Sequence, residues 1–163
     1  MEALAARLAE NHAPTVFFLD LDGFKGVNGT HGHATGDELL RAFTKRFSSA
    51  LRTSDVGARF GGDEFIALVH GLDDNTSSIR FGQRLIEMIE QPFQLRIGSI
   101  SISASIGLVR ASSGLSPEEI VKRADAAAYD AKAAGKGRVR VSGNELLPGP
   151  AALLADEIRR RRG

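Results

Sequence analysis

The sequence predicts an α+β fold in which helices flank a mixed, mainly antiparallel β-sheet. Three observations lead to this prediction: apolar runs typical of strands, apolar residues at helical spacing between them, and an irregular order of the two along the chain. The predicted core order is β-α-β-β-α-β-β-α-β, in which neighbouring strands form hairpins between the helices. A regular parallel sheet needs a crossover helix between successive strands and is therefore not expected.

The first half of the chain contains two predicted helices and three predicted strands. In chain order they are a helix, a strand, a helix and two strands, over residues 1–10, 15–19, 36–51, 56–60 and 65–69. The first strand is a continuous apolar run and is therefore expected to be buried. Gly61 and Gly62 separate the last two strands. Because both glycines can adopt positive φ in a tight turn, these strands are predicted to form a β-hairpin.

The second half contains two further helices and three strands. In chain order they are a helix, two strands, a helix and a short strand, over residues 73–91, 93–97, 100–109, 116–134 and 138–141. Beyond this core, a short helix that ends at residues 159–162 is predicted after the prolines at 148 and 150. The two strands are predicted to form a hairpin that turns at Gly98-Ser99, and the longer one alternates apolar residues with serine or glycine. Ser116 is the predicted N-cap of the next helix, Glu119 would complete its capping box, and Gly135 would end the helix.

The composition is that of a globular protein and excludes several kinds of site. The 163 residues fit one domain, 42% are hydrophobic and 25% are charged. The absence of cysteine excludes disulfides, thiolate metal sites and a cysteine nucleophile. A net charge of +1 creates no overall field for nucleic acid or an anionic membrane. We expect a cytoplasmic protein with no nucleic-acid partner and no direct membrane insertion, since neither a spanning apolar run nor a signal peptide is visible.

Four acidic residues follow predicted strands or turns. Asp20 and Asp22 come directly after the first strand and share one face, while Leu21 points away. Acids at the end of a buried strand are costly unless they are paired, solvated or bound to metal. Asp63 and Glu64 follow the glycine pair, so Asp20 and Asp63 converge on a possible Mg²⁺ site if the hairpin pairs next to the first strand. Taken alone, the first two acids could be solvated loop residues and the second two an ordinary turn.

Basic and polar residues suggest a site for a nucleotide. Gly23, Phe24 and Lys25 open a short helical turn whose backbone N–H groups and Lys25 ammonium could cradle phosphate. Lys132 and Lys136 are four residues apart at the end of the late helix, so they would share a face. The alternative for the two lysines is a solvated basic surface.

Asn28 and Asp37 could recognise a purine edge. An amide side chain offers a donor and an acceptor, whereas a carboxylate accepts from the N–H groups of guanine, which adenine does not offer as a pair. As isolated residues, Asn28 would lie on the polar face of a helix, and Asp37 would be a cap or lie in the first turn of its helix.

The order and spacing of these residues closely resemble the GGDEF family of diguanylate cyclases. The similarity covers about residues 5–141, and the segments that carry it are 20–28, 32–33, 36–37, 59–65, 103–107 and 124–132. We therefore expect a GGDEF domain over residues 1–142, with residues 143–163 as a C-terminal tail or the start of a linker. The family usually begins with an Asp-x-Leu-Thr-Gly-Leu-x-Asn-Arg segment, which we expect to be missing here.

The resemblance implies a palm-like fold with a ferredoxin-like core and an extra β-hairpin. It implies a diguanylate cyclase that condenses two GTP into cyclic di-GMP and two pyrophosphate at the interface of a homodimer. Asp20, the Leu21 carbonyl and Asp63, with Glu64 in support, would hold Mg²⁺ or Mn²⁺. The catalytic residues would be Asp63, Glu64 and Asp20, with Asp63 helping to activate the 3′-hydroxyl of GTP.

The resemblance also implies roles in binding substrate and product. Asn28 and Asp37 would bind guanine, with Leu40 near the base. Lys25, Lys132 and Lys136 would contact the phosphates, and Phe24 and Gly62 would also bind the substrate. Arg52 and Asp55 match the family's Arg-x-x-Asp inhibitory site, where cyclic di-GMP would bind. Lys136 replaces a usual arginine and keeps the charge.

Two other functions remain open from the sequence. One is a catalytically weak or inactive GGDEF module that binds GTP or cyclic di-GMP and regulates an attached sensor or phosphodiesterase domain. The intact Asp20, Asp63 and Glu64 favour the enzyme, whereas the expected loss of the N-terminal segment favours the module. The other is a different nucleotidyl cyclase or polymerase-like activity on the same fold, against which Asn28 and Asp37 argue by favouring guanine.

Overall fold

Seven strands and four helices make up the part of the chain that the computed structural model describes, residues 14–111 and 115–143. The strands are β1 (Thr15–Asp22), β2 (Val56–Gly61), β3 (Glu64–Val69), β4 (Phe93–Leu95), β5 (Gly98–Ile100), β6 (Ser103–Arg110) and β7 (Val139–Val141). The helices are α2 (Phe24–His31), α3 (His33–Ala50), α4 (Asn75–Glu90) and α5 (Pro117–Ala133). The helix predicted over residues 1–10 and the one predicted near the C-terminus lie outside the described residues.

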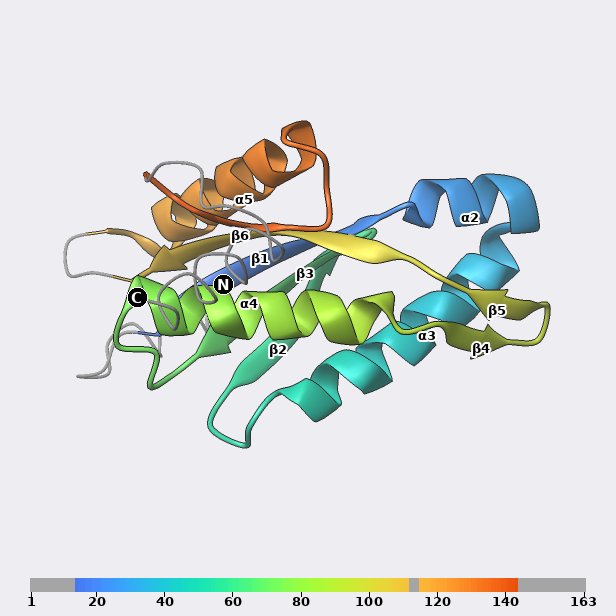
Figure 1. The fold of residues 1–163 in the computed structure, drawn as a ribbon, viewed down its shortest axis with the longest axis horizontal. Helices are drawn as coiled ribbons and strands as arrows, with labels where there is room; N and C mark the ends of the chain where they lie inside the picture. Colours follow the sequence, from blue (N-terminus) through green and yellow to red (C-terminus); the bar gives the residue numbers. More distant parts are fainter. Residues whose placement is uncertain (1–13, 112–114, 144–163) are drawn as a thin grey trace, which may run out of the picture.

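A five-stranded sheet in the order β2-β3-β1-β6-β7 forms the centre of the fold. All its neighbouring strands are antiparallel except β6 and β7, which are parallel. Helix α5 covers one face of the sheet, and α3 and α4 cover the other (Figure 1). The prediction of a mixed, mainly antiparallel sheet flanked by helices is therefore confirmed.

Strand β1 lies in the middle of the sheet and is buried on both faces. Phe17, Leu19 and Leu21 join the larger apolar core beneath α3 and α4, whereas Val16 and Phe18 join a smaller core beneath α5. This double burial explains why the sequence of β1 is continuously apolar and does not alternate. The two acids at its end therefore continue a rigid, central element.

The strand predicted over residues 100–109 is two strands. β5 pairs with β4 in a separate two-stranded sheet, and β6 begins three residues later in the main sheet. Leu95 pairs with Gly98, so the hairpin turns at Arg96-Ile97 and the predicted turn at Gly98-Ser99 is wrong. Alternation of apolar and polar residues indicates only that the chain is extended and that its two faces have different surroundings. It does not report where the chain leaves one sheet and joins another.

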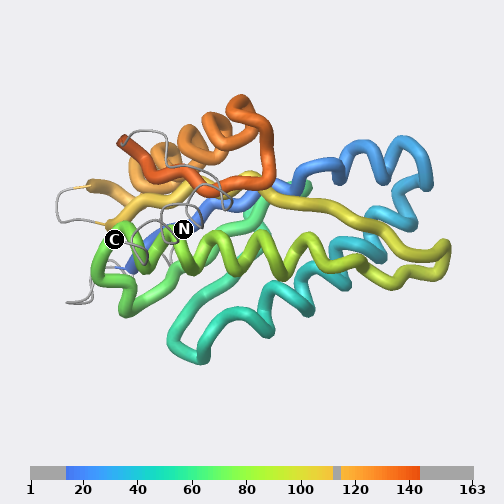
Figure 2. Tube along the Cα trace, in the orientation of Figure 1, coloured from blue at the N-terminus to red at the C-terminus, as the bar shows by residue number. Residues whose placement is uncertain are grey.

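The short helical turn predicted after β1 is a complete helix, α2. Gly26 and Gly29 lower its intrinsic helix propensity, but Phe24 and Val27 are buried in the larger core and stabilise it by packing. Helix α3 begins at His33, earlier than predicted, so Asp37 lies beyond its first turn. Figure 2 shows α2 at the same end of the molecule as the β4–β5 hairpin.

Helix α5 begins and ends largely as predicted. The Glu119 N–H donates to the Ser116 hydroxyl at 3.2 Å, and Pro117 occupies the first turn. The predicted N-cap is therefore confirmed. The Glu119 carboxylate accepts from Arg123 and not from the Ser116 N–H, so the second bond of the predicted capping box is not formed. The helix ends at Ala133, and Gly135 follows with φ +114°.

Across residues 14–111 and 115–143, each helix is either too short or too polar to cross a bilayer.

Candidate functional site

The end of β1 and the glycine turn of the β2–β3 hairpin lie side by side. β3 pairs directly with β1, which confirms the predicted placement of the hairpin. In this register Asp20 lies opposite Glu64, and the Leu21 N–H donates to the Asp63 carbonyl at 3.1 Å. Gly61 ends β2 and pairs with Glu64, so the hairpin turns at Gly62-Asp63, one residue later than predicted, and Gly62 has φ +51°. The structure thus brings Asp20, Asp63 and Glu64 together at one end of the sheet, where β1 ends and the β2–β3 hairpin turns.

Asp20 is partly buried among charges of both signs. Lys132 of α5 forms an ion pair with its Oδ2, while its Oδ1 is buried and has no hydrogen-bond partner among the described residues. Burial raises the pKa of Asp20, the Lys132 contact partly opposes this, and the Asp63 and Asp22 carboxylates add to the rise. An acid with an unsatisfied buried oxygen needs a further positive or donor group.

Glu64 has a similar environment. Burial raises its pKa, and the neighbouring carboxylates of Asp20, Asp125 and Asp63 raise it further. Like charges directly opposite each other on paired strands are destabilising. Asp125 of α5 belongs to a sequence segment that we singled out, but nothing in the sequence indicated that it faces this hairpin.

These residues fit a divalent cation bound together with a phosphate ligand. Carboxylate oxygens are the ligands Mg²⁺ prefers, and the unpartnered Asp20 Oδ1 supplies one. Within the described part of the chain, no group of three His, Asp or Glu side chains is arranged to hold a metal by itself. Mg²⁺ commonly takes only one or two protein carboxylates and completes its shell with water and substrate phosphate oxygens. The metal-binding roles of Asp20, Leu21, Asp63 and Glu64 remain predictions.

Asp22 differs from Asp20 although both lie on the same face of β1. It is only 8% exposed, and its carboxylate accepts hydrogen bonds from the Ser105 hydroxyl and the Gly137 N–H. Ser105 belongs to a segment that carries the family resemblance, but the sequence predicted no role for Ser105 or for Gly137. The contact with Gly137 joins residues 115 positions apart, which no local pattern can reveal.

The predicted phosphate-binding residues come from two segments. Lys25 is exposed and is the second residue of α2, which begins directly after Gly23, a residue with φ +90°. The Phe24 side chain is buried in the core, so only its backbone is available to a ligand. Lys132 is on α5, but Lys136 lies beyond the end of this helix with φ +61°. The prediction that the two lysines share a helix face is therefore wrong, because the helix ends between them.

The predicted guanine-binding residues lie where α2 and α3 meet. A Cβ on Gly36 would stand 1.8 Å from the Asn28 Oδ1, so the absence of a side chain at residue 36 lets Asn28 pack there. The Asn28 Oδ1 is buried without a hydrogen-bond partner among the described residues. A cavity of about 430 Å³ beside α3 is lined by Asp37, Leu40 and Arg59, among others. Arg59 donates to the Gly62 carbonyl at 2.9 Å and links this cavity to the glycine turn.

Arg52 and Asp55 lie between α3 and β2, at the other end of β2 from the glycine turn. The Asp55 carboxylate accepts from the Arg52 N–H at 2.9 Å and from the His70 N–H at 3.3 Å, while the Arg52 side chain is exposed. The predicted inhibitory pair is thus assembled on one turn, separate from the acidic residues at the end of β1. Its role remains a prediction.

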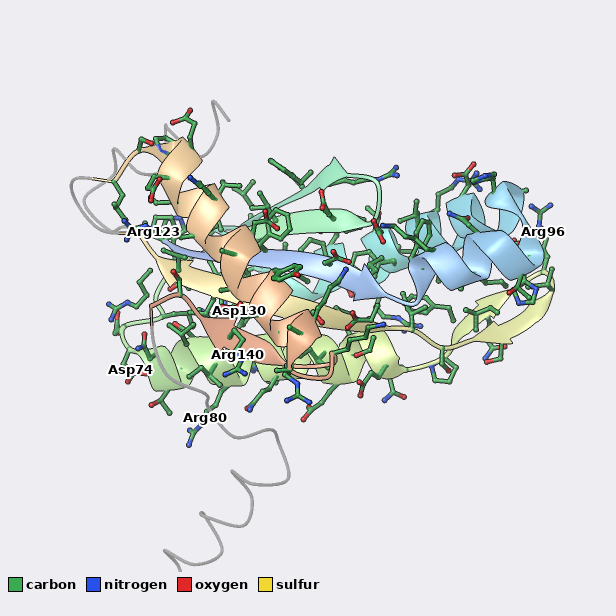
Figure 3. All side chains as sticks on the ribbon, turned by 90° about the horizontal axis from the view of Figure 1, so that it is seen from above. Asp74, Arg80, Arg96, Arg123, Asp130 and Arg140 are labelled. Atoms are coloured by element: carbon green, nitrogen blue, oxygen red, sulfur yellow. The ribbon has the colours of Figure 1, made fainter. Side chains whose placement is uncertain are left out.

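Figure 3 shows α5 lying across β1 and β6. This helix brings Lys132 to Asp20 and Asp125 close to Glu64. Residues from β1, the β2–β3 turn and α5 therefore meet at one end of the sheet, and Arg59 connects the turn to the cavity beside α3. Periodicity predicted most of these elements, but their convergence is a property of the tertiary structure.

The chain is similar to known proteins of one family. The family model described as "Diguanylate cyclase, GGDEF domain" matches residues 1–138. The cyclic di-GMP phosphodiesterase NbdA of Pseudomonas aeruginosa is 38% identical over 81% of this chain, and diguanylate cyclase A of Treponema denticola is 34% identical over 81%. The chain spans only 17% and 36% of the lengths of these two relatives.

A solved structure shows the same fold. The GGDEF domain of DgcB from Caulobacter crescentus, crystallised in complex with c-di-GMP, has a TM-score of 0.80 and 26% sequence identity, and the match covers 88% of each chain. The family match extends over most of the chain, and the sheet, helices and glycine turn agree with it. The chain therefore belongs to the GGDEF domain family.

Proposed function

We propose that this domain is a diguanylate cyclase, which condenses two GTP into cyclic di-GMP and two pyrophosphate. The observation that carries the proposal is the position of Asp20, which lies opposite Glu64, beside Asp63 and in contact with Lys132. One of its oxygens is buried and has no partner within the part of the chain that the structure describes. Asp20 and Glu64, two carboxylates with raised pKa values close to a lysine, suit a metal-bound triphosphate. Relatives that are diguanylate cyclases support the same reaction.

The reaction is phosphoryl transfer between two bound nucleotides. The 3′-oxygen of one GTP forms a bond to the α-phosphorus of the other, the bond to pyrophosphate breaks, and the same exchange on the opposite side closes the ring. Asp63 would accept the proton of the 3′-hydroxyl, and Asn28 and Asp37 would orient guanine. Lys25, Lys132 and Lys136 would bind phosphate oxygens. Positioning and charge neutralisation provide most of the catalysis in such reactions.

Asp20, the Leu21 carbonyl, Asp63 and Glu64 are the groups that would hold Mg²⁺ or Mn²⁺. A bound divalent ion neutralises charge on the attacking and leaving oxygens. Each domain would bind one GTP, so two domains must face each other for the two nucleotides to react. We propose that the active form is a homodimer.

The direct test is incubation with GTP and Mg²⁺, followed by chromatography for cyclic di-GMP and pyrophosphate. We expect both products from the wild type and neither from Asp63→Ala. Asp130→Ala is the matched control, because Asp130 is an exposed carboxylate on α5 (Figure 3). A wild-type domain that binds GTP but forms no product at high protein concentration would exclude the cyclase.

In that case the second candidate applies, a GGDEF module that binds GTP or cyclic di-GMP and regulates an attached domain. The similarity to NbdA, a cyclic di-GMP phosphodiesterase of which this chain spans 17%, supports this candidate. Nucleotide binding without turnover, together with a nucleotide-dependent change in the activity of an attached domain, would support it.

We further propose that cyclic di-GMP inhibits the enzyme by binding at Arg52 and Asp55. The exposed Arg52 guanidinium can pair with phosphate and stack on a base. In Arg52→Ala, turnover should continue at product concentrations that stop the wild type. Arg80→Ala, which removes an arginine of α4, is the control and should be inhibited like the wild type. Equal inhibition of Arg52→Ala and the wild type would contradict this site.

A further inference from the structure

The hydrogen bonds around Asp22 have no part in the mechanism proposed above. Asp22 is the last residue of β1, and the Ser105 hydroxyl donates to its Oδ1 and Oδ2 at 3.1 and 2.9 Å. Its Oδ2 also accepts from the Gly137 N–H at 3.1 Å. Ser105 is fully buried on β6. The two carboxylates at this strand end therefore differ: across residues 14–111 and 115–143, one oxygen of Asp20 has no partner, while both oxygens of Asp22 are hydrogen-bonded.

The turn that Asp22 contacts has an unusual backbone. Gly135, Lys136 and Gly137 follow α5 with φ values of +114°, +61° and +53°. Lys136 is the only non-glycine residue with positive φ in the described part of the chain. This region is unfavourable for a residue with a Cβ, which adopts it only when the surroundings hold it there.

Three hydrogen bonds hold the backbone of Lys136 and Gly137. Its N–H donates to the Ala131 carbonyl at 3.1 Å, and its carbonyl accepts from the Arg138 Nε at 2.9 Å. The next N–H, that of Gly137, donates to Asp22. The peptide group between Lys136 and Gly137 is therefore held at both its oxygen and its nitrogen. Of the three contacts, only the one with Asp22 comes from a distant part of the chain.

We propose that Asp22 is a positioning residue that holds Lys136 in its left-handed conformation, so that the Lys136 ammonium meets the phosphates of GTP. This inference rests on the proposed function, in which GTP is the substrate. Asp20 and Asp22 are two residues apart on one central strand. The same strand end thus sets the position of the carboxylate expected to bind the cation and of the turn that carries the lysine.

The test is the affinity for guanosine 5′-(α,β-methylene)triphosphate in the presence of Mg²⁺, measured by calorimetry. The carbon bridge of this ligand prevents release of pyrophosphate, so binding is measured without turnover. Asp22→Ala and Lys136→Ala should each weaken binding about tenfold, as expected for the loss of a hydrogen bond to a charged group. The double variant should bind no more weakly than Lys136→Ala, because Asp22 acts through Lys136.

Two further variants separate this role from general stability. Ser103→Ala removes a 2.8 Å hydrogen bond to Glu90 beside the same turn and leaves the Asp22 contacts in place, so its affinity should equal that of the wild type. Asp22→Asn keeps an acceptor for the Gly137 N–H and should stay within about threefold of the wild type. If Asp22→Ala does not fold, Asp22→Ser takes its place in the test, because the serine side chain is still polar but is one bond shorter than that of aspartate.

The two proposals fail in different ways. If the wild type binds the nucleotide and Asp22→Ala binds equally well, or if the losses in the double variant add, the role of Asp22 is overturned and the cyclase stands. If the wild type does not bind the nucleotide at all, the proposed function is overturned, and the role of Asp22 with it.

Discussion

Asp20 carries its charge in a place that is unfavourable without a bound cation. Burial and two nearby carboxylates raise its pKa, and burial and three carboxylates raise that of Glu64. At a pH between the ordinary and the raised pKa values, these two carboxyl groups therefore stay protonated in the folded protein but are ionised in the unfolded chain. The contribution of these groups to stability is greatest below their ordinary pKa values, 3.8 and 4.5, and it falls as the pH rises through the raised values of the folded state.

Asp20→Asn should consequently stabilise the metal-free protein at neutral pH while abolishing cyclase activity. We expect its melting temperature in EDTA to exceed that of the wild type by about 2–4 °C at pH 7, the shift that about 1 kcal/mol produces in a domain of this size. The difference should shrink as the pH falls towards 3.8, where the wild-type carboxyl becomes protonated in both states. Thermal unfolding followed by circular dichroism measures it, and a less stable variant at pH 7 would contradict the expectation.

At the scale of elements, helix boundaries depend on single side chains. Asp74 caps α4: its carboxylate accepts from the Ser77 N–H, and the Ser77 hydroxyl lies 3.4 Å from the Asp74 N–H (Figure 3 shows Asp74 at this end of the helix). The hydrogen bonds with Ser77 lower the pKa of Asp74. A lowered carboxyl pKa contributes stability above the ordinary value of 3.8, and this contribution is lost as the pH falls through the folded-state value.

Asp74→Ala should therefore lower the melting temperature at pH 7, and the difference from the wild type should decrease as the pH falls below 3.8. Asp73→Ala, one residue before the cap, serves as the control and should melt close to the wild type at every pH. A constant difference between Asp74→Ala and the wild type across this range would show that the charge of the cap is unimportant.

The contact between α5 and β6 depends on a residue without a side chain. A Cβ on Gly107 would lie 1.9 Å from the Ala124 carbonyl oxygen and 2.4 Å from the Ala128 nitrogen, both backbone atoms of α5. The helix therefore packs directly on the strand at this point. Because α5 carries Lys132 and Asp125, this close approach also determines how the helix meets the acidic residues.

Gly107→Ala should displace α5 and destabilise the domain by about 1–3 kcal/mol, the usual cost of overpacking. Gly29→Ala is the matched control, since Gly29 lies in α2 and a Cβ at this residue would have no neighbouring atom within 4 Å. The control should be neutral or slightly stabilising, because alanine favours a helix more than glycine. Urea unfolding of both variants measures the difference, and equal stability would contradict the close packing.

At the scale of the whole molecule, one domain supplies one set of predicted nucleotide-binding residues. Two GTP must react, so the proposed activity requires two domains. The rate per domain should therefore rise with protein concentration until the dimer is saturated. The measurement is initial rate against concentration over about a hundredfold range around the dimer dissociation constant.

Mixing experiments test the same point independently. An excess of Asp63→Ala should suppress the activity of a fixed amount of wild type, because mixed dimers have one competent half. An equal excess of Gly29→Ala, which retains Asp63, is the control and should not suppress it. A rate per domain that is independent of concentration and insensitive to Asp63→Ala would exclude the dimeric mechanism.

Local patterns were sufficient for much of this protein. The continuous apolar run of β1, the pairing of β2 and β3 in a hairpin, the Ser116 cap and the glycine after α5 were all predicted correctly, because each depends on residues close together in the chain. The order and spacing of the motif residues also predicted the family. Helix α2 was underestimated, because packing of Phe24 and Val27 outweighs the weak helix propensity of its glycines.

By itself, the sequence determined the class of fold, the family and the candidate residues, since periodicity, capping and motif spacing are local properties. Only the tertiary structure decided that Asp20 faces Glu64, that Lys132 pairs with Asp20, that Asp22 holds Gly137, and that residues 100–109 divide between two sheets. The physical reason is the same in each case: these features depend on which distant segments pair and pack, and strand register and helix position are set by the whole core.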